Sequence, residues 1–283
     1  RDQMTAVNGK AITYDNAGNP TEYYDGTELM WEGRELSGAW LSDGRMYSYT
    51  YNADGIRDSK QEIDGGTITT HSYRLMGDKV VEDKWGTNKR LVFMYDENGA
   101  PNTVYYYNNS TSATKYYYVL NLQGDVTEIR STSNALVAQY NYDAFGNILS
   151  IKDANGANIT SSTHIANVNP LRYRGYFYDT ETGFYYLNSR YYDPATRRFI
   201  SADLLIDERD FDSLNLYAYC GNDPVNRKDA GGAAWDIVFD IVSVGFSIGD
   251  VACNPEDPWA WVGLGLDIAC TIVPFVSGGG TAV

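Results

Sequence analysis

Two kinds of hydrophobic pattern divide the chain. Through much of residues 10–200, aromatic or apolar side chains alternate with polar ones, as in residues 45–51 (RMYSYTY) and 114–120 (TKYYYVL). A period of two places alternate side chains on opposite faces of a β-strand. From residue 235 onward tyrosine is absent, and valine, isoleucine, glycine and alanine dominate. The pattern predicts a mainly β body over about residues 10–200, followed by a segment of different structure.

Four turn motifs of similar composition separate the predicted strands. They occupy residues 14–19 (YDNAGN), 51–55 (YNADG), 95–99 (YDENG) and 142–147 (YDAFGN). Counted from the aspartate or asparagine, the steps between them are 37, 44 and 47 residues, so the repeat varies in length. In each motif a tyrosine at a strand end leads into a turn where glycine or asparagine supplies positive φ. The sequence therefore predicts a degenerate repeat of β-hairpins.

Tyrosines at every second position place their rings on one face of a sheet. In one interpretation these rings are cross-strand pairs that stabilise the sheet. In the other they form an aromatic wall that binds sugars or holds an unfolded cargo. We favour the first, because the pattern alone does not show that the rings are exposed.

The C-terminal segment has helical periodicity in two stretches, residues 235–248 and 259–273. Asn254 or Asp257 would cap the second helix, and Pro258 would lie in its first turn. Both stretches are short for a membrane span and each contains an aspartate, so we expect a helical hairpin under the β body. Contact of this segment with a target membrane is the alternative.

Composition and charge argue against two classes of function, nucleic-acid binding and metal or cofactor chemistry. The 283 residues include 25 tyrosines and 27 glycines, and the formal net charge is −15, which argues against nucleic-acid binding because that needs a basic surface. The three cysteines and two histidines have no metal-ligand spacing, so we expect no metal and no cofactor. They are Cys220, Cys253, Cys270, His71 and His164.

The most specific stretch is residues 175–203, GYFYDTETGFYYLNSRYYDPATRRFISAD. It is followed by NLYAYCGNDPVN at residues 215–226 and KDAGG at residues 228–232. This ordered series of aromatic and turn residues resembles the core-terminating signature of the RHS/YD-repeat family. That family includes bacterial polymorphic toxins, wall-associated proteins, Tc toxin C components and, more distantly, teneurins.

The resemblance implies a fold and a domain organisation. The fold would be a YD-repeat β-sheet spiral or shell that ends in the RHS core plug, with a short α-helical hairpin at the C-terminus. Residues 1–170 would form the shell, residues 171–232 the core-associated signature, and residues 233–283 a hydrophobic pre-toxin linker.

The resemblance also implies a self-cleaving activity, because some members cut themselves once, in cis, with chemistry like that of an aspartyl protease. Matched motif to motif, the two aspartates fall on Asp203 and Asp229, and an arginine of the RYYDP element falls on Arg190. Two neighbouring carboxyl groups share a proton, so that one acts as base toward water while the other polarises the scissile carbonyl. The expected cut lies between Ala233 and Ala234.

The chain departs from the family pattern at this site. Leu204 and Ala230 stand where the family usually has proline, and Ala233 stands where it has a large apolar residue. In a second interpretation, Asp203 and Asp229 are turn or cap residues that bind local amides. The sequence leaves both interpretations open.

The function implied is encapsulation and delivery of a C-terminal toxin domain carried in cis, by a secreted or cell-wall-associated bacterial protein. No toxin chemistry is apparent in these residues. An immunity protein and secretion machinery would be further partners. The rival function is an adhesin that binds glycans through the tyrosine-rich sheets.

Overall fold

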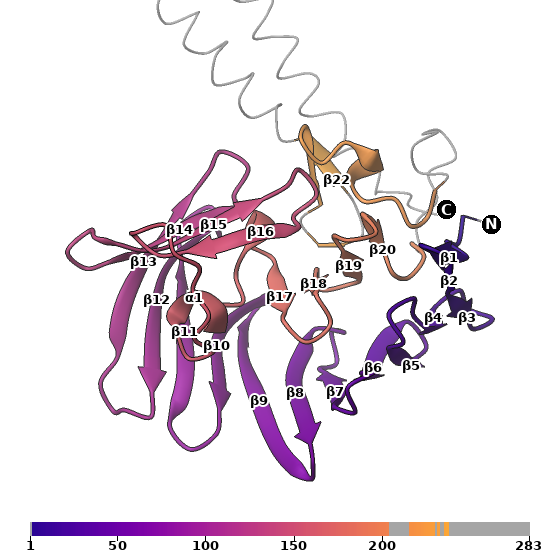
Figure 1. The fold of residues 1–283 in the computed structure, drawn as a ribbon, viewed down its shortest axis with the longest axis horizontal. Helices are drawn as coiled ribbons and strands as arrows, with labels where there is room; N and C mark the ends of the chain where they lie inside the picture. Colours follow the sequence, from indigo (N-terminus) through magenta and orange to yellow (C-terminus); the bar gives the residue numbers. More distant parts are fainter. Residues whose placement is uncertain (1, 204–214, 230, 233–234, 238–283) are drawn as a thin grey trace, which may run out of the picture.

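The computed structural model describes residues 2–203, 215–229, 231–232 and 235–237. It is mainly β, with 49% of residues in strands and 5% in helices, which confirms the mainly β part of the predicted fold. Figure 1 shows a large curved sheet with a smaller sheet, β17 to β20, packed inside the curve.

The large sheet contains fourteen strands in chain order, each antiparallel to the next, and it is not closed. Its strands are β3 (Thr13–Tyr14), β4 (Pro20–Glu22), β5 (Glu28–Glu32), β6 (Glu35–Trp40), β7 (Met46–Tyr51), β8 (Arg57–Asp64), β9 (Thr67–Met76), β10 (Lys79–Trp85), β11 (Lys89–Tyr95), β12 (Pro101–Asn108), β13 (Thr114–Leu120), β14 (Val126–Ser131), β15 (Leu136–Tyr142) and β16 (Ile148–Lys152). Both strands that the alternating pattern predicted are present, as β7 and β13.

Three smaller sheets and a few helical turns complete the described residues. The pairs are β1 (Ala6–Val7) with β2 (Lys10–Ala11) and β21 (Arg227–Asp229) with β22 (Trp235–Ile237); the four-stranded sheet comprises β17 (Phe177–Asp179), β18 (Phe184–Tyr186), β19 (Tyr191–Asp193) and β20 (Arg198–Phe199). The helical turns are α1 (Ile165–Val168), η1 (Tyr173–Gly175) and η3 (Cys220–Asn222).

The strand β22 corrects one prediction. The sequence predicts a helix that begins at residue 235, but residues 235–237 pair antiparallel with β21, with Asp229 opposite Trp235. Pairing with a neighbouring strand overrides local propensity here. The rest of the predicted helical hairpin, residues 238–283, lies outside the described residues.

The predicted turn motifs share one hydrogen-bond pattern. In the first, Asp15 Oδ1 accepts from the backbone N–H groups of Ala17 and Asn19, at 2.9 and 2.8 Å. Asn52, Asp96 and Asp143 accept in the same way from residues two and four further on. The glycine of each motif has positive φ, between 74° and 89°. Aspartate and asparagine suit this position because their side-chain oxygen accepts hydrogen bonds from backbone N–H groups inside the turn.

The tyrosine of each motif has a role that the sequence did not reveal. Its hydroxyl donates to a backbone carbonyl earlier in the chain: Tyr51 to Leu36, Tyr95 to Val80 and Tyr142 to Val126, at 2.8 to 2.9 Å. The register of the sheet shifts by one residue at each of these tyrosines. The repeat therefore couples a bulge, a turn and a link to an earlier strand.

Most tyrosine rings lie in the core rather than on the surface. Tyr117 is the exposed one among the 25, at 37% of its maximum. Of the two interpretations of the tyrosine pattern, the packing one describes the sheet.

Residues 177–199, which hold β17 to β20, fill the concave side of the large sheet (Figure 1) and are called the core segment below. It reaches the early strands, where the Tyr51 and Tyr191 hydroxyls are 2.9 Å apart. It also reaches the last hairpin, because the hydroxyls of Tyr185 and Tyr192 donate to the carbonyls of Gly146 and Phe145. This core segment thus connects strands far apart in the sheet.

Candidate functional site

Three segments bring the candidate residues together. Arg190 precedes β19, Asp203 follows β20, and Asp229 ends β21. The N–H of Asp203 donates to the carbonyl of Leu216 at 2.8 Å, which places it beside the chain that leads to β21. The hydroxyl of Tyr176 donates to the carbonyl of Asp229 at 2.6 Å. Tyr176 is itself buried in a cluster with Tyr185 and Tyr219, so this bond attaches β21 to that cluster.

Both candidate aspartates contact one guanidinium nitrogen. Arg190 Nη2 lies 2.7 Å from Asp203 Oδ2 and 3.7 Å from Asp229 Oδ2, so the two carboxyl groups are neighbours. Arg190 Nη1 donates to the carbonyl of Leu216 at 3.1 Å, and the guanidinium carbon lies 3.6 Å from the centre of the Phe199 ring. The structure therefore brings Arg190, Asp203 and Asp229 into one cluster.

The two carboxyl groups differ in environment. The Asp229 side chain is 2% exposed, whereas that of Asp203 is 17% exposed. Burial raises the pKa of Asp229 to about 6, against the opposite effects of Arg190 and of the N–H groups of Gly232 and Gly231; the Asp203 charge raises it further. Burial outweighs the ion pair at 3.7 Å, so Asp229 takes up a proton at mildly acidic pH.

The cluster also binds the chain that follows it. Asp229 Oδ1 accepts from the N–H groups of Gly231 and Gly232, at 3.2 and 2.6 Å, and the Arg190 guanidinium donates to the carbonyl of Gly232. Asp229 is thus a turn residue as well as a buried acid, and features of both sequence interpretations are present. The predicted cleavage site, Ala233 and Ala234, lies outside the described residues, as do Leu204 and Ala230.

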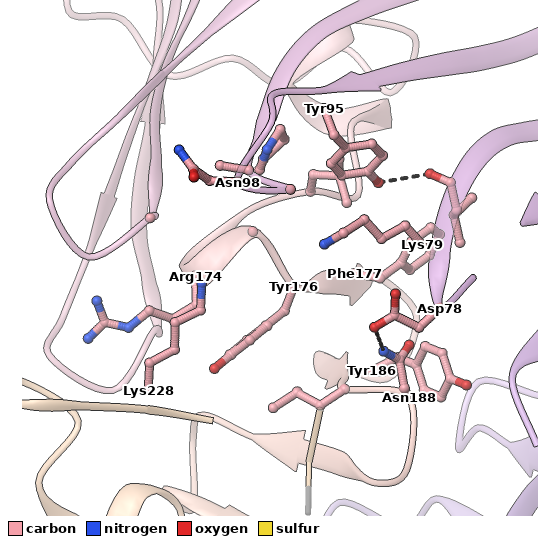
Figure 2. A pocket seen from close by; sticks show the side chains of 18 of the residues that line it. Asp78, Lys79, Tyr95, Asn98, Arg174, Tyr176, Phe177, Tyr186, Asn188 and Lys228 are labelled. Carbon is pink, nitrogen blue, oxygen red and sulfur yellow. Dashed lines mark hydrogen bonds between the residues drawn. The ribbon is translucent and has the colours of Figure 1, made fainter. Parts of the chain in front are cut away.

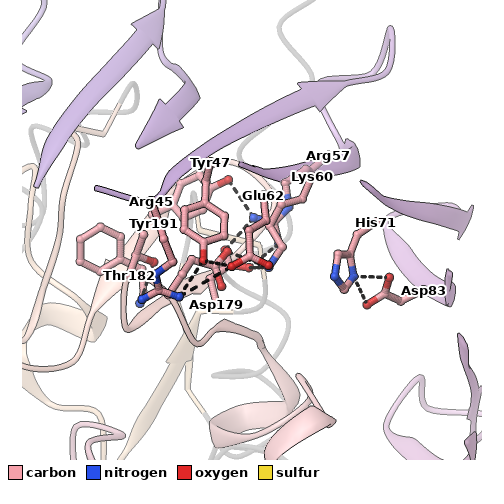
Figure 3. Close-up of polar contacts among 12 residues, drawn as sticks. Arg45, Tyr47, Arg57, Lys60, Glu62, His71, Asp83, Asp179, Thr182 and Tyr191 are labelled. Atoms are coloured by element: carbon pink, nitrogen blue, oxygen red, sulfur yellow. Dashed lines mark hydrogen bonds and ion pairs between the residues drawn. The ribbon is translucent and has the colours of Figure 1, made fainter. Parts of the chain in front are cut away.

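A second buried polar network has no counterpart among the sequence predictions (Figure 3). The Arg57 guanidinium makes two hydrogen bonds to the carboxylate of Asp179, at 2.6 and 3.0 Å, and both side chains are at most 1% exposed. Lys60 lies 2.7 Å from Glu181. These pairs join β8 to the core segment across 122 and 121 residues, a separation that no local spacing reveals.

The histidine and cysteine residues are placed in packing or polar contacts. His71 Nδ1 lies 2.8 Å from Asp83 Oδ1, and its ring stacks on Trp85. His164 caps α1 by accepting from the N–H of Ala166. Cys220 is buried with a free thiol. Among the described residues, His, Cys, Asp and Glu form no group of three that could hold a metal ion.

A cavity of about 250 Å³ lies between the large sheet and the core segment (Figure 2). Lys79 points into it and lies 5.3 Å from the centre of the Tyr95 ring, and Asn188 donates to Asp78 at 3.4 Å. Arg174 lines it from the other side, but its guanidinium donates to backbone carbonyls. Arg190, Asp203 and Asp229 do not line this cavity.

No family model matches the chain. It is 33% identical over 268 residues to the tRNA nuclease WapA of Bacillus subtilis strain 168, covering 92% of this chain and 10% of the relative. It is 32% identical over 288 residues to the tRNA(Glu)-specific nuclease WapA of Bacillus subtilis subsp. natto, covering 98% and 11%. The chain thus spans about a tenth of the length of these curated relatives.

Solved structures share the fold. A crystal structure of TcdB2-TccC3 matches with a TM-score of 0.61 at 22% identity, over 77% of this chain and 11% of that one. The Tc holotoxin pore of Photorhabdus luminescens matches with a TM-score of 0.59 at 19% identity, over 80% and 11%.

The described residues therefore have the β-rich fold of RHS-type toxins. Over nearly the whole of this chain, the sequence relatives are nucleases named WapA. No helix within the described residues is both long and apolar enough to span a membrane.

Proposed function

We propose that this chain is part of an encapsulation and delivery module that holds a C-terminal toxin domain in cis and releases it by cutting itself once after Ala233. The observation that carries the proposal is the cluster of Arg190, Asp203 and Asp229. Two of its members, Arg190 and Asp229, bind the backbone of Gly231 and Gly232. A pair of neighbouring acids beside Gly232, which directly precedes Ala233 in the chain, supports such a cut.

The wall of the container would be the large sheet, and the core segment would be its plug. The buried contacts between Arg57 and Asp179 and between Tyr185 and Gly146 support this, because they fix the plug to two distant parts of the wall. The TcdB2-TccC3 and WapA relatives support a toxin context. By analogy with them we place the protein outside the cell or on the cell wall. Secretion machinery and an immunity protein would be its partners.

The proposed chemistry assigns one task to each side chain. Protonated Asp229 donates a hydrogen bond to the scissile carbonyl, and the Asp203 carboxylate takes a proton from water. The water oxygen adds to the carbonyl carbon and the carbon–nitrogen bond breaks. The leaving nitrogen takes up the proton that Asp203 received from water, which returns Asp203 to the carboxylate form. Arg190 holds both carboxyl groups in place. One chain is both catalyst and substrate, so the reaction occurs once.

The cut is tested on the natural polypeptide that carries this segment and its toxin. Wild type should appear on a denaturing gel as two fragments, whereas Asp203→Asn and Asp229→Asn should stay intact. Asp96→Asn is the matched control and should be cut like wild type, because Asn52 already fills the equivalent turn position. Wild type that stays in one piece would contradict the proposed release.

Encapsulation is tested by protease protection of Asp229→Asn, in which the toxin stays attached. The toxin should resist an added protease while the β body is folded and be degraded when the body is unfolded. A toxin that is degraded equally fast in both conditions would contradict encapsulation.

A further inference from the structure

The backbone of Gly231 and Gly232 is held at all four of its polar groups. Besides the two N–H groups bound by Asp229 and the Gly232 carbonyl bound by Arg190, the Gly231 carbonyl accepts from the hydroxyl of Ser189 at 2.7 Å and from its N–H at 3.3 Å. The side chains of Asp229, Arg190 and Ser189, with one backbone N–H, therefore hold the backbone of this dipeptide.

The two glycines differ in the space around them. Gly232 has φ of +76°, and a Cβ added to it would lie 2.7 Å from the carbonyl oxygen of Leu187, 2.8 Å from Ser189 Oγ and 3.2 Å from the N of Arg190. A Cβ on Gly231 would meet no atom within 4 Å. Two of the three close atoms at Gly232 belong to the backbone, so they cannot turn aside as a flexible side chain does.

We propose that self-cleavage requires glycine at position 232. Only glycine lets the backbone approach residues 187–190 closely enough for the Gly232 carbonyl to accept a hydrogen bond from Arg190. Ser189 is a positioning residue that acts through the Gly231 carbonyl. The inference rests on the proposed self-cleavage and adds a requirement on the N-terminal side of the bond. A side chain at 232 would displace the Gly232 carbonyl from Arg190, and with it the start of the segment that we propose is cut.

The test compares two neighbouring substitutions in the 283-residue chain, Gly231→Ala and Gly232→Ala. The fraction cut is followed over time on a denaturing gel. Gly231→Ala should be cut within about twofold of the wild-type rate, and Gly232→Ala should be slower by roughly tenfold to a hundredfold, because a misplaced reacting group costs that much. Melting curves show whether each variant is folded.

Ser189 provides a second test that does not depend on the folding of Gly232→Ala. Ser189→Ala should slow the cut by about threefold to tenfold, the usual effect of one lost hydrogen bond. The pH dependence should be unchanged, because the acids are untouched. Ser189→Thr keeps the hydroxyl and should restore the rate.

Failure of the inference differs from failure of the proposed function. If wild type splits and Gly232→Ala splits as fast as Gly231→Ala, the glycine requirement is wrong and self-cleavage stands. If a folded Ser189→Ala matches wild type, the positioning role of Ser189 is wrong and self-cleavage again stands. If wild type never splits under any condition, the proposed release and the inference that rests on it both fail.

Discussion

At the scale of the residue, the repeat is a hydrogen-bonding unit more than a hydrophobic one. The aspartate or asparagine of each motif closes a turn through its side chain, and the tyrosine before it donates to an earlier carbonyl. This explains why the motif tolerates changes in spacing: the contacts are made within the turn and to one earlier strand. Glycine is needed at Gly99 because its φ is +75°.

Tyr95→Phe tests the tyrosine link. It removes the hydroxyl that donates to the Val80 carbonyl while keeping the ring. We expect the free energy of unfolding to fall by about 1 kcal/mol, the typical net value of one such bond. Tyr117→Phe, at an exposed ring, should change it by less than about 0.5 kcal/mol. Denaturant unfolding of both variants measures the difference, and equal effects would show that the link contributes nothing.

Asp179→Ala tests the buried ion pair. It leaves the guanidinium of Arg57 buried without its carboxylate, which should cost about 3–5 kcal/mol of unfolding free energy. Arg74→Ala removes an ion pair with Glu82 in which the arginine side chain is 70% exposed, and should cost less than about 1 kcal/mol. Chemical denaturation compares the two, and similar losses would contradict a role for the pair in fixing the core segment.

At the scale of the element, β21 joins structure to the proposed chemistry. It pairs with β22, ends at Asp229, and is attached through Tyr176 to a buried cluster that includes Tyr185 and Tyr219. The buried end of the strand is what raises the pKa of Asp229 to about 6. A carboxyl group kept protonated near neutrality serves as an acid, but its burial makes stability depend on pH.

The sign of that dependence follows from the raised pKa. The folded chain binds the Asp229 proton more tightly than the unfolded chain, so the stabilisation is complete below about pH 4 and is lost as pH rises through about 6. Asp229→Asn carries no such proton. Relative to this variant, wild type should therefore lose about 2–3 kcal/mol of stability between pH 4 and pH 7. Thermal unfolding at several pH values measures it, and parallel curves would contradict the raised pKa.

At the scale of the whole molecule, an open sheet of fourteen strands bends around the core segment of the same chain. The core segment contacts both early and late parts of the sheet, so folding of the large sheet and docking of the core segment are coupled. Such long-range contacts are consistent with the proposed encapsulation.

The sequence predicted the local features and the resemblance, and it missed the long-range ones. Residues 114–120 form β13 with the expected bounds, and the turn motifs close as predicted, because alternation and turn chemistry are local. The resemblance marked Arg190, Asp203 and Asp229. The Arg57–Asp179 pair was missed because its partners lie 122 residues apart and burial of a charge leaves no periodic signal. The strand β22 was missed because residues 235–248 have helical periodicity, whereas residues 235–237 pair with the neighbouring strand β21.

The most direct test of self-release is the intact mass of the purified 283-residue chain after incubation near pH 6, where Asp229 is half protonated. We expect two masses, for a body that ends at Ala233 and a tail that begins at Ala234. Asp203→Asn and Asp229→Asn should each give one. A single full-length mass for wild type at every pH between about 4 and 8 would contradict self-cleavage and leave the two aspartates a structural role.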